Sequence, residues 1–434
     1  MLQIDASQSQ VTTLDNGLRV ASSDLSVPAT TVGLYVATGS AFEAVPGTAH
    51  VLQQMAFKST ASRSHFKMVR DCERLGAAAS CTASREHLVY QVDTLKDSVP
   101  EVVAMLAETA TTAKFLPWEV EAQAATLRAE VKEFCSNHQA LLQEMIHPAA
   151  YGASSPLGAP VMVKESNLSS IDAAVLNDFV SKELVPSKMV LAAAGYDHDL
   201  LVSLATTHFG AHPKGTECSS LAPSAKYIGG ESRISSEEGL THCAIAFEGV
   251  GWKSDSLVAL CVLNTLMGGG ASFSAGGPGK GMYTRLYQNI LNRYPQVQAA
   301  SVFNAFYNET GLFGVYGAAP AASMGALVAA LCDEMKKVAS SISGEELDRA
   351  KNQLTSSLMM NLESRAVLFE DIGRQTLVYG GRVPPEKLVS QIAAVTTAEL
   401  TSLASNLLKT PPSVAVHGDT TSVPRYDLIA KQFA

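Results

Sequence analysis

A repeat at about half the length of the chain is the sequence feature that most constrains its fold. Residues 169–172 resemble a capping box before a helix, and residues 186–195 follow as an apolar strand that ends in glycine. The same arrangement returns at residues 396–399 and 412–418, with offsets of 396 − 169 = 227 and 412 − 186 = 226 residues. Two offsets this similar indicate an internal duplication, so the sequence predicts two similar halves.

Each half is expected to mix helices with strands. Ser64, for example, can cap a helix that ends at Gly76, and β-rich runs lie on both sides of this segment. Residues 210–230 are rich in Gly, Pro, Ser and Lys and show no periodic pattern, as expected of an exposed linker. The sequence therefore predicts an α+β fold with an N-terminal half at 1–209, a linker at 210–230 and a C-terminal half at 231–434.

Composition excludes several classes of protein. Hydrophobic residues make up 47% of the chain and charged residues 17%, which is typical of a globular protein and not of a disordered one. The net charge of −9 argues against a nucleic-acid partner and is compatible with a basic peptide ligand. No apolar stretch is long enough to cross a bilayer. The seven scattered cysteines indicate a reducing compartment.

A helix around residues 47–57 carries a zinc motif with altered ligands. The inverted zinc-protease motif H-x-x-E-H needs imidazoles at its first and last positions and a glutamate as general base. Here it reads His50-Val51-Leu52-Gln53-Gln54. The amide of Gln53 cannot act as a base, and the amide oxygen of Gln54 is a poor zinc ligand. Glu130, 76 residues after Gln54 on a long helix that Pro117 opens, is the candidate for the remaining ligand of this vestigial site.

Each residue of this set also has a plain structural interpretation. His50 alone would be a hydrogen-bonded helix histidine, and Glu130 alone would be a solvated helix carboxylate. The other histidines, His242 and His417 among them, show no ligand spacing with one another, and we assign them no chemistry.

A glycine-rich segment in the second half cannot form an ordinary helix or strand, because seven of its fourteen residues are glycine. The segment fails as a phosphate loop, since Ser274 and Gly281 occupy positions where G-x-x-x-x-G-K-[ST] needs Gly and Ser or Thr. It is either a connector between helices or a binding loop, and its length favours a binding loop. Its candidate residues are Gly268, Gly269, Gly270, Ser272, Phe273, Ser274, Gly276, Gly277, Pro278, Gly279, Lys280 and Gly281.

Several segments together resemble one known family. They are residues 47–60, 64–66, 83–86, 268–287, 360–365 and 370–375. Their wording is similar to that of the α-subunits of mitochondrial processing peptidases, in the plant and algal form, within the pitrilysin-type inverzincin family. The resemblance runs from about Val11 to the C-terminus, so it covers essentially the whole chain.

The resemblance implies a fold, a partner and a location. It implies two α/β-sandwich halves that form a clamshell around a cavity, and a homologous β-subunit that holds the intact zinc motif. The α-subunit itself is then catalytically silent and has no cofactor, with zinc expected in the β partner. The location implied is mitochondrial, on the matrix side of the inner membrane. Plant-type members also serve as a core subunit of the cytochrome bc complex, respiratory complex III.

The resemblance also implies which residues bind substrate. The family uses the glycine-rich segment as a substrate-recognition loop, and we carry this role onto residues 268–281. Presequences are basic, so carboxylates should receive them, and Glu363, Glu370 and Asp371 lie in a matching segment. The alternative for each of the three is a solvated carboxylate on an acidic helix face.

Three functions remain to be weighed. The leading one is a non-catalytic α-subunit that binds presequences for a zinc-bearing β-subunit and that also belongs to complex III. The second is a purely structural core protein of complex III, which loss of the glycine-rich segment would have favoured. The third, an active zinc peptidase, would require groups from elsewhere to replace Gln53 and Gln54.

Overall fold

The chain is described by a computed structural model over residues 9–215, 225–237, 239–271 and 282–433. Its residues form two compact units. The first comprises Met1–Lys132, Pro160–Pro223 and Met359–Pro385, and the second comprises Glu133–Ala159, Ser224–Leu358 and Glu386–Ala434. The domains expected at 1–209 and 231–434 follow the repeats along the chain. The compact units differ from them in that one stretch of each repeat belongs to the unit of the other.

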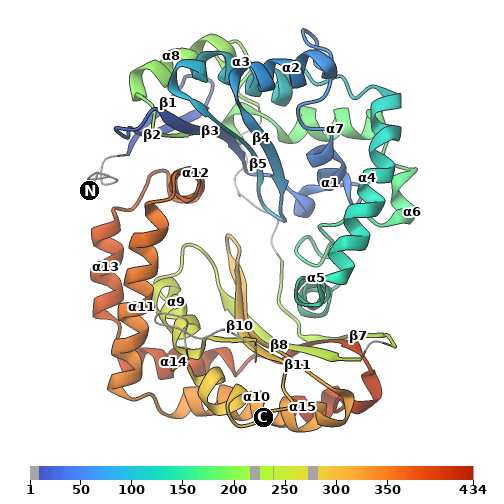
Figure 1. Cartoon of the computed structure of the whole chain (residues 1–434), viewed down its shortest axis with the longest axis vertical. Helices are drawn as coiled ribbons and strands as arrows, with labels where there is room; N and C mark the ends of the chain where they lie inside the picture. The colour runs from blue at the N-terminus through green and yellow to red at the C-terminus, as the bar shows by residue number, and fades with distance from the viewer. Residues whose placement is uncertain (1–8, 216–224, 238, 272–281, 434) are drawn as a thin grey trace. The chain divides into compact units, whose positions relative to one another are not determined.

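Among the described residues of the first unit, six strands form one sheet in the order β1-β2-β6-β3-β5-β4 (Figure 1). β2 and β6 are parallel, and the other neighbours are antiparallel. The strands are β1 (Gln10–Thr13), β2 (Arg19–Ser23), β3 (Ala29–Val36), β4 (Ala78–Ala83), β5 (Leu88–Leu95) and β6 (Met189–Ala194).

The described part of the second unit also contains a sheet of six strands, in the order β7-β12-β8-β11-β10-β9. Here β7 and β12 are parallel, and the other neighbours are antiparallel. The strands are β7 (Gly230–Ser235), β8 (Thr241–Val250), β9 (Gly269–Ala271), β10 (Ala299–Phe306), β11 (Thr310–Ala319) and β12 (Ser413–Gly418).

The two sheets repeat the same topology. The order β2-β6-β3-β5-β4 in the first corresponds strand by strand to β7-β12-β8-β11-β10 in the second, with the same parallel and antiparallel neighbours. β1 and β9 are the additions at opposite ends of this common order. The expected α+β fold of two similar halves is therefore confirmed.

One detail of the repeat is wrong in the sequence analysis. The helix of the first half begins at Ala173, and its N-cap is Asp172, whose carboxylate accepts hydrogen bonds from the backbone N–H groups of Ala174 and Val175. Ser169 ends the preceding short helix instead. In the second half Thr396 is the N-cap, as expected. Measured between these caps (396 − 172) and between the starts of β6 and β12 (413 − 189), both offsets are 224 residues.

The sheet of the first unit is covered by helices on both faces. Alternate residues of a strand point to opposite faces, so Val32 and Leu34 of β3 lie in the core with α1, α3 and α8, while Gly33 and Tyr35 face α12. The helices are α1 (Thr48–Gln54), α2 (His65–Leu75), α3 (Val99–Thr111), α4 (Pro117–Ser136), α6 (Glu165–Leu168), α7 (Ala173–Glu183), α8 (His198–Phe209) and α12 (Arg365–Tyr379).

Helix α12 is bound to this sheet at both ends although it lies late in the sequence. At its N-terminal end the Arg365 guanidinium donates to Thr31 Oγ1 (3.0 Å) and lies 3.4 Å from the Asp93 carboxylate. At its C-terminal end Arg19 donates to the carbonyl oxygens of Thr376 (2.7 Å) and Leu377 (3.2 Å). A cation at a helix C-terminus satisfies unpaired carbonyls and opposes the negative end of the helix dipole.

The sheet of the second unit is covered in a similar way. One face packs on α9, α10 and α14, and the other packs on α5, through Leu142, Met145 and Ile146. Thus α5, from the first repeat, covers the second sheet, and α12, from the second repeat, covers the first. The helices are α5 (His138–Tyr151), α9 (Leu257–Met267), α10 (Met324–Ser340), α11 (Gly344–Leu362), α13 (Pro385–Ala394), α14 (Thr397–Leu407) and α15 (Tyr426–Ala430).

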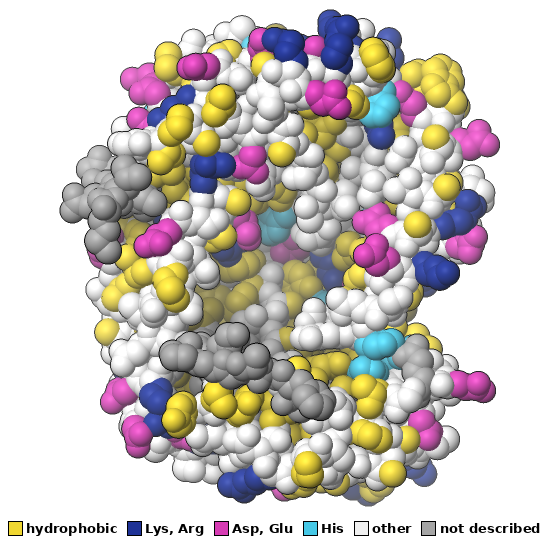
Figure 2. All heavy atoms as spheres, in the orientation of Figure 1, with side chains coloured by type: hydrophobic (Ala, Val, Ile, Leu, Met, Phe, Trp, Pro, Cys, Tyr) yellow, Lys and Arg dark blue, Asp and Glu magenta, His cyan; other side chains and the backbone are white. Residues whose placement is uncertain are grey.

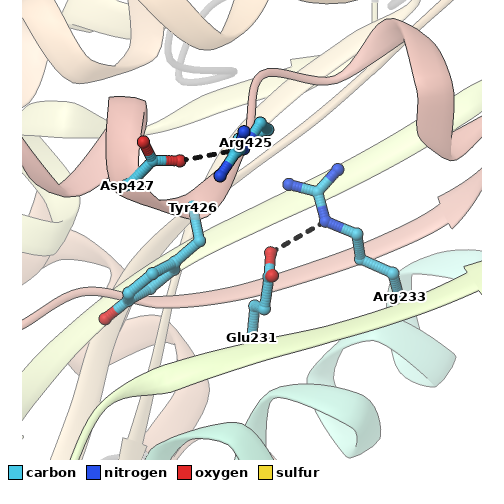
Figure 3. Close-up of a pocket in the computed structure, with 5 residues that line it drawn as sticks. All are labelled: Glu231, Arg233, Arg425, Tyr426 and Asp427. Carbon is cyan, nitrogen blue, oxygen red and sulfur yellow. Dashed lines mark hydrogen bonds and ion pairs between the residues drawn. The ribbon is translucent and has the colours of Figure 1, made fainter.

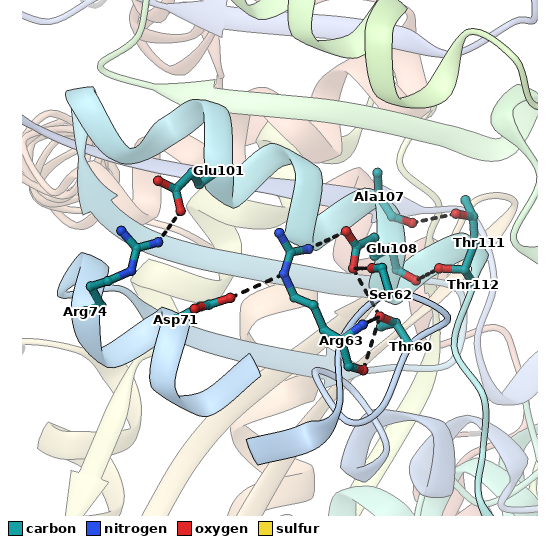
Figure 4. A network of polar contacts seen from close by, with 10 residues as sticks. All are labelled: Thr60, Ser62, Arg63, Asp71, Arg74, Glu101, Ala107, Glu108, Thr111 and Thr112. Atoms are coloured by element: carbon teal, nitrogen blue, oxygen red, sulfur yellow. Dashed lines mark hydrogen bonds and ion pairs between the residues drawn. The ribbon is translucent and has the colours of Figure 1, made fainter. Parts of the chain in front are cut away.

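Polar contacts and surface charge complete the picture of the fold. Arg63, just before α2, pairs with Glu108 of α3 and lies 3.4 Å from Asp71 of α2, so a charge network joins the two helices (Figure 4). On the face drawn in Figure 2, side chains of both charge signs are interspersed. In the described ranges no helix is both long and apolar enough to cross a membrane.

Candidate functional site

Helix α1 positions the degenerate zinc motif in the first unit. It follows Gly47, which has φ 99°, and its first turn is capped by the carboxylate of Glu43, which accepts hydrogen bonds from the N–H groups of Gly47 (2.6 Å) and Ala49 (2.5 Å). Burial raises the pKa of Glu43 to about 8, although the backbone N–H groups of this turn lower it. His50, one turn into the helix, is only 1% exposed.

The structure places Glu130 beside this helix, as the sequence analysis expects. The Glu130 carboxylate lies 3.3 Å from Nε2 of His50 and accepts a 2.6 Å hydrogen bond from the side-chain amide of Gln54. The side-chain oxygen of Gln53 accepts a 2.9 Å hydrogen bond from the backbone N–H of Ala83, at the end of β4. The four expected residues are thus close together, and both amides form specific bonds.

The two nitrogens of His50 have unlike partners, and this determines what the ring can do. Nδ1 accepts a 3.1 Å hydrogen bond from the backbone N–H of Val163, so the proton of the neutral ring lies on Nε2, facing Glu130. Burial lowers the pKa of His50, and this effect exceeds the opposite influence of Glu130, so the neutral ring is favoured.

These residues do not fit a catalytic zinc ion. A histidine that binds metal through one nitrogen donates a hydrogen bond from the other, to a carboxylate, a carbonyl or water. In His50 the other nitrogen accepts a bond instead, and the second imidazole is replaced by the amide of Gln54. In the part of the chain that the structure describes, no three His, Cys, Asp or Glu side chains are grouped so that they could hold a metal ion.

The glycine-rich segment is described only at its ends. Ser272, Phe273, Ser274, Gly276, Gly277, Pro278, Gly279, Lys280 and Gly281 lie outside the described residues. Gly268 follows α9 with φ 58°, and Gly269 has φ 112° and approaches β10 so closely that a Cβ atom would overlap the Ala300 carbonyl. Gly270 faces open space. Glycine is therefore required by the backbone at 268 and 269.

The two described ends of this segment are bonded to each other. The backbone N–H of Gly269 donates to Oγ1 of Thr284 (3.2 Å). The next residue, Arg285, is 8% exposed and donates to the Ser341 carbonyl (2.6 Å) and to the Glu346 carboxylate (2.9 Å). Burial raises the pKa of Glu346, but hydrogen bonds from Arg285 and Ser343 lower it further than that, to below its ordinary value. The base of the segment is thus fixed by an ionised pair.

The three candidate acidic residues lie in different surroundings. Glu363 is exposed between α11 and α12, and the Glu370 side chain is 60% exposed on α12. Asp371 is more buried: its carboxylate accepts from Gln375 (2.5 Å) and pairs with Arg382 (2.7 Å), whose side chain is 2% exposed. The sequence analysis missed this pairing, although the i, i+4 spacing of Asp371 and Gln375 was visible in it.

Sequence reasoning also missed a cluster of histidines in the second unit. His138, His242 and His417 stack on one another, although they come from α5, β8 and β12. Their sequence spacing carries no signal, because the strand order brings them together.

A surface pocket of about 460 Å³ beside β7 is formed by Glu231, Arg233, Arg425, Tyr426 and Asp427 (Figure 3). Arg233 pairs with Glu231 (2.8 Å), and Arg425 pairs with Asp427 (3.2 Å). Because these charges are paired within the pocket, we assign it no ligand.

Comparison with known proteins follows the same two-part organisation. The sequence matches the family descriptions Insulinase (Peptidase family M16) over residues 19–164 and Peptidase M16 inactive domain over residues 170–354. A mitochondrial-processing peptidase subunit alpha of Solanum tuberosum is 42% identical over 99% of this chain and 86% of its own length. A probable alpha-1 subunit of Arabidopsis thaliana is 39% identical over the same shares, and the human alpha subunit is 35% identical over 97% and 84%.

Proposed function

This chain belongs to the M16 peptidase family, among the α-subunits of mitochondrial processing peptidases, and from this premise we propose that it is a non-catalytic subunit that binds presequences. Its partner is a homologous β-subunit that carries zinc and performs the cleavage. The chain acts in mitochondria, on the matrix side of the inner membrane.

One observation carries the non-catalytic assignment: the bonds of the side chains at positions 53 and 54. A general base must accept a proton from water, whereas Gln53 is a neutral amide whose oxygen is bound to the N–H of Ala83. A zinc ligand must offer a lone pair, whereas Gln54 offers its N–H group to Glu130. The polar groups of the family site are therefore used here to join α1 to β4 and α4.

Zinc content and turnover test this assignment together. We expect the isolated chain to bind less than 0.1 zinc per molecule and to leave a presequence peptide intact, and we expect cleavage once the β-subunit is added. The matched control is a β-subunit whose motif glutamate is replaced by glutamine, which should abolish turnover of the pair. Tight 1:1 zinc with turnover by the chain alone would overturn the assignment.

Presequence binding is supported by the exposure of Glu363 and Glu370, which leaves two carboxylates accessible to basic side chains. In the reconstituted heterodimer, E363Q/E370Q should raise KM for a basic presequence several-fold with little change in kcat. E386Q, which removes an exposed carboxylate from α13, is the control and should leave KM unchanged. Equal effects of both changes would indicate a general charge effect and contradict a binding role.

The glycine-rich segment is proposed to contribute to the same binding. Deletion of residues 272–281 leaves the bonded ends at Gly269 and Thr284 in place. The deletion should weaken precursor processing while the heterodimer still forms on size-exclusion chromatography. Unchanged kinetics would refute the role of this segment.

Membership of respiratory complex III is the most distant part of the proposal, and the plant-like wording of the sequence supports it. Native gels and mass spectrometry on mitochondria in mild detergent test it. Co-migration with cytochrome b, cytochrome c₁ and the β-subunit is expected. Recovery of a pair with the β-subunit alone would remove this part of the proposal and leave the peptidase role.

A further inference from the structure

Three imidazole rings stack where the first turn of α5 meets the second sheet. The ring of His138 lies with its centroid 4.4 Å from that of His242, at 30° between planes, and 5.3 Å from that of His417, at 24°. His242 and His417 are cross-strand partners in the pairing of β8 with β12. His138 therefore covers a pair of histidines that the sheet holds side by side.

The three rings differ in how firmly they are held. His242 and His417 are only 5% and 7% exposed, and both lie on strands in the middle of the sheet. His242 shares a 2.8 Å hydrogen bond through Nδ1 with the Tyr316 hydroxyl. His138 is half-buried and is the first residue of α5, directly after the N-cap Asn137. Of the three, His138 is thus the one that can leave the stack without breaking a strand.

The stack is not arranged as a metal site. Nearly parallel rings direct their nitrogen lone pairs along separate planes, whereas a metal needs lone pairs that converge on one point. This agrees with the lack of any metal-like group of side chains in the described ranges.

The groups around the stack do little to neutralise added charge. From β11 it meets the phenol of Tyr316, and burial raises the pKa of that group to about 12, so it stays uncharged. From β7 the residue in register with His417 is Ile234. The neighbouring charges have other partners: Arg233 donates to the Pro424 carbonyl (2.6 Å), and the Asp419 carboxylate accepts from Thr421. Nδ1 of His417 is buried and has no hydrogen-bond acceptor within the described part of the chain.

One proton and two protons should affect such a stack in opposite ways. A single imidazolium is attracted to the π-face of a neutral ring, so one proton is tolerated. A second proton places like charges about 4 to 5 Å apart at a largely buried site, where repulsion is much stronger than in water. A charge on His138 is also disfavoured by the positive end of the α5 dipole.

We propose that this histidine stack is a pH-sensitive attachment of α5 to the second sheet. It holds while at most one of its rings is protonated, and it releases the first turn of α5 when a second ring is protonated. The position gives the release a consequence, because the chain passes from the first compact unit to the second at Lys132–Glu133, five residues before His138. Acidification would thus loosen the segment that joins α4, which carries Glu130, to α5.

Hydrogen exchange on the full chain measures this release directly. After correction for the intrinsic pH dependence of exchange, amides of residues 138–146 should exchange at least tenfold faster at pH 5.5 than at pH 8.0. Peptides from β8 and α9 should stay equally protected at both pH values, which shows that the unit remains folded. An equal rate in residues 138–146 at the two pH values would overturn the proposal.

Two variants separate charge from packing. H138F keeps an aromatic ring in the stack but cannot be protonated, so its corrected rates at the two pH values should agree within twofold. H212Q, which removes a histidine of the first unit, should behave like the unaltered chain. A pH response that persists in H138F would refute the assignment to the stack.

A second measurement needs no variant and covers the case in which H138F does not fold. In chain labelled with ¹³C at histidine Cε1, the three stacked rings should titrate in separate steps, with midpoints at least one pH unit apart. Three independent titrations with coinciding midpoints would overturn the proposal.

Discussion

Asp371 offers the sharpest test of how the acidic candidates divide between binding and stability. Its carboxylate accepts a hydrogen bond from Gln375 and pairs with Arg382 at 2.7 Å, and the Arg382 side chain is 2% exposed. D371N keeps the shape of the side chain but removes the charge that faces this buried guanidinium. Removing one partner of a buried pair typically costs about 3 to 5 kcal/mol of unfolding free energy. Because the amide oxygen that D371N introduces can still accept from Gln375, we expect a loss near the lower end, about 3 kcal/mol.

Glu370 is the matched control, one residue away on the same helix. Its side chain is 60% exposed, and its nearest cation, Nε of Arg374, lies 3.8 Å away. An exposed pair of this kind contributes about 0 to 1 kcal/mol. E370Q should therefore leave the unfolding free energy nearly unchanged while it raises KM for presequence peptide.

Urea unfolding followed by circular dichroism gives the first quantity, and processing by the reconstituted heterodimer gives the second. We expect D371N to lose stability and to keep KM at a temperature where it is folded. The double variant D371N/R382M should lose less than the sum of its single changes, since both remove one interaction. If D371N kept its stability within about 0.5 kcal/mol and raised KM as E370Q does, Asp371 would be a binding residue and this reasoning would fail.

Three further predictions concern local structure. G373A should lower the unfolding free energy by about 1 to 3 kcal/mol, measured in urea, because a Cβ atom there would overlap the Tyr35 ring; no loss would show that α12 can move aside. The folded state holds a proton on Glu43 up to about pH 8 that the unfolded chain releases near its ordinary pKa of 4.5. Unfolding free energy should therefore fall as pH rises from about 4.5 to 8, and E43Q should remove this part of the slope; identical slopes would refute the raised pKa. T284V removes the acceptor of the Gly269 N–H, so it should cost about 1 kcal/mol and weaken precursor processing, and unaltered processing would show that this bond does not position the segment.

Local signals in the sequence predicted the elements well where a single residue determines a boundary. Ser64 caps α2 through Lys67, and the helix ends at Gly76 in the left-handed conformation. α4 begins at Pro117 and ends at Ser136, as expected. These boundaries follow from the chemistry of the residues at the ends, so no tertiary information is needed. Asp172 shows the limit, because several cap-forming residues stand in a row there and only packing selects one.

Contacts between distant segments could not be predicted in the same way. Nothing in the sequence near α12 indicates that it covers the first sheet, because its two fastenings, Arg19 and Asp93, lie more than 270 residues earlier. The histidine stack depends on the pairing of β8 with β12 and on the placement of α5. The vestigial zinc site was found because its spacing is local on α1, and the resemblance to a family supplied Glu130.

The duplication explains why amides, and not apolar residues, occupy positions 53 and 54. In the second repeat α9 follows β8 as α1 follows β3, and its residues are almost all apolar and buried, with neither His nor Gln. In the first repeat Glu130 is 30% exposed and lies against the buried ring of His50, so an apolar residue at 54 would leave this carboxylate without its amide donor. Likewise, an apolar residue at 53 would leave the N–H of Ala83 without its acceptor. As long as Glu130 and β4 stay in place, α1 must keep polar side chains at these positions even without a metal, because the hydrogen bonds that they make now stabilise the fold.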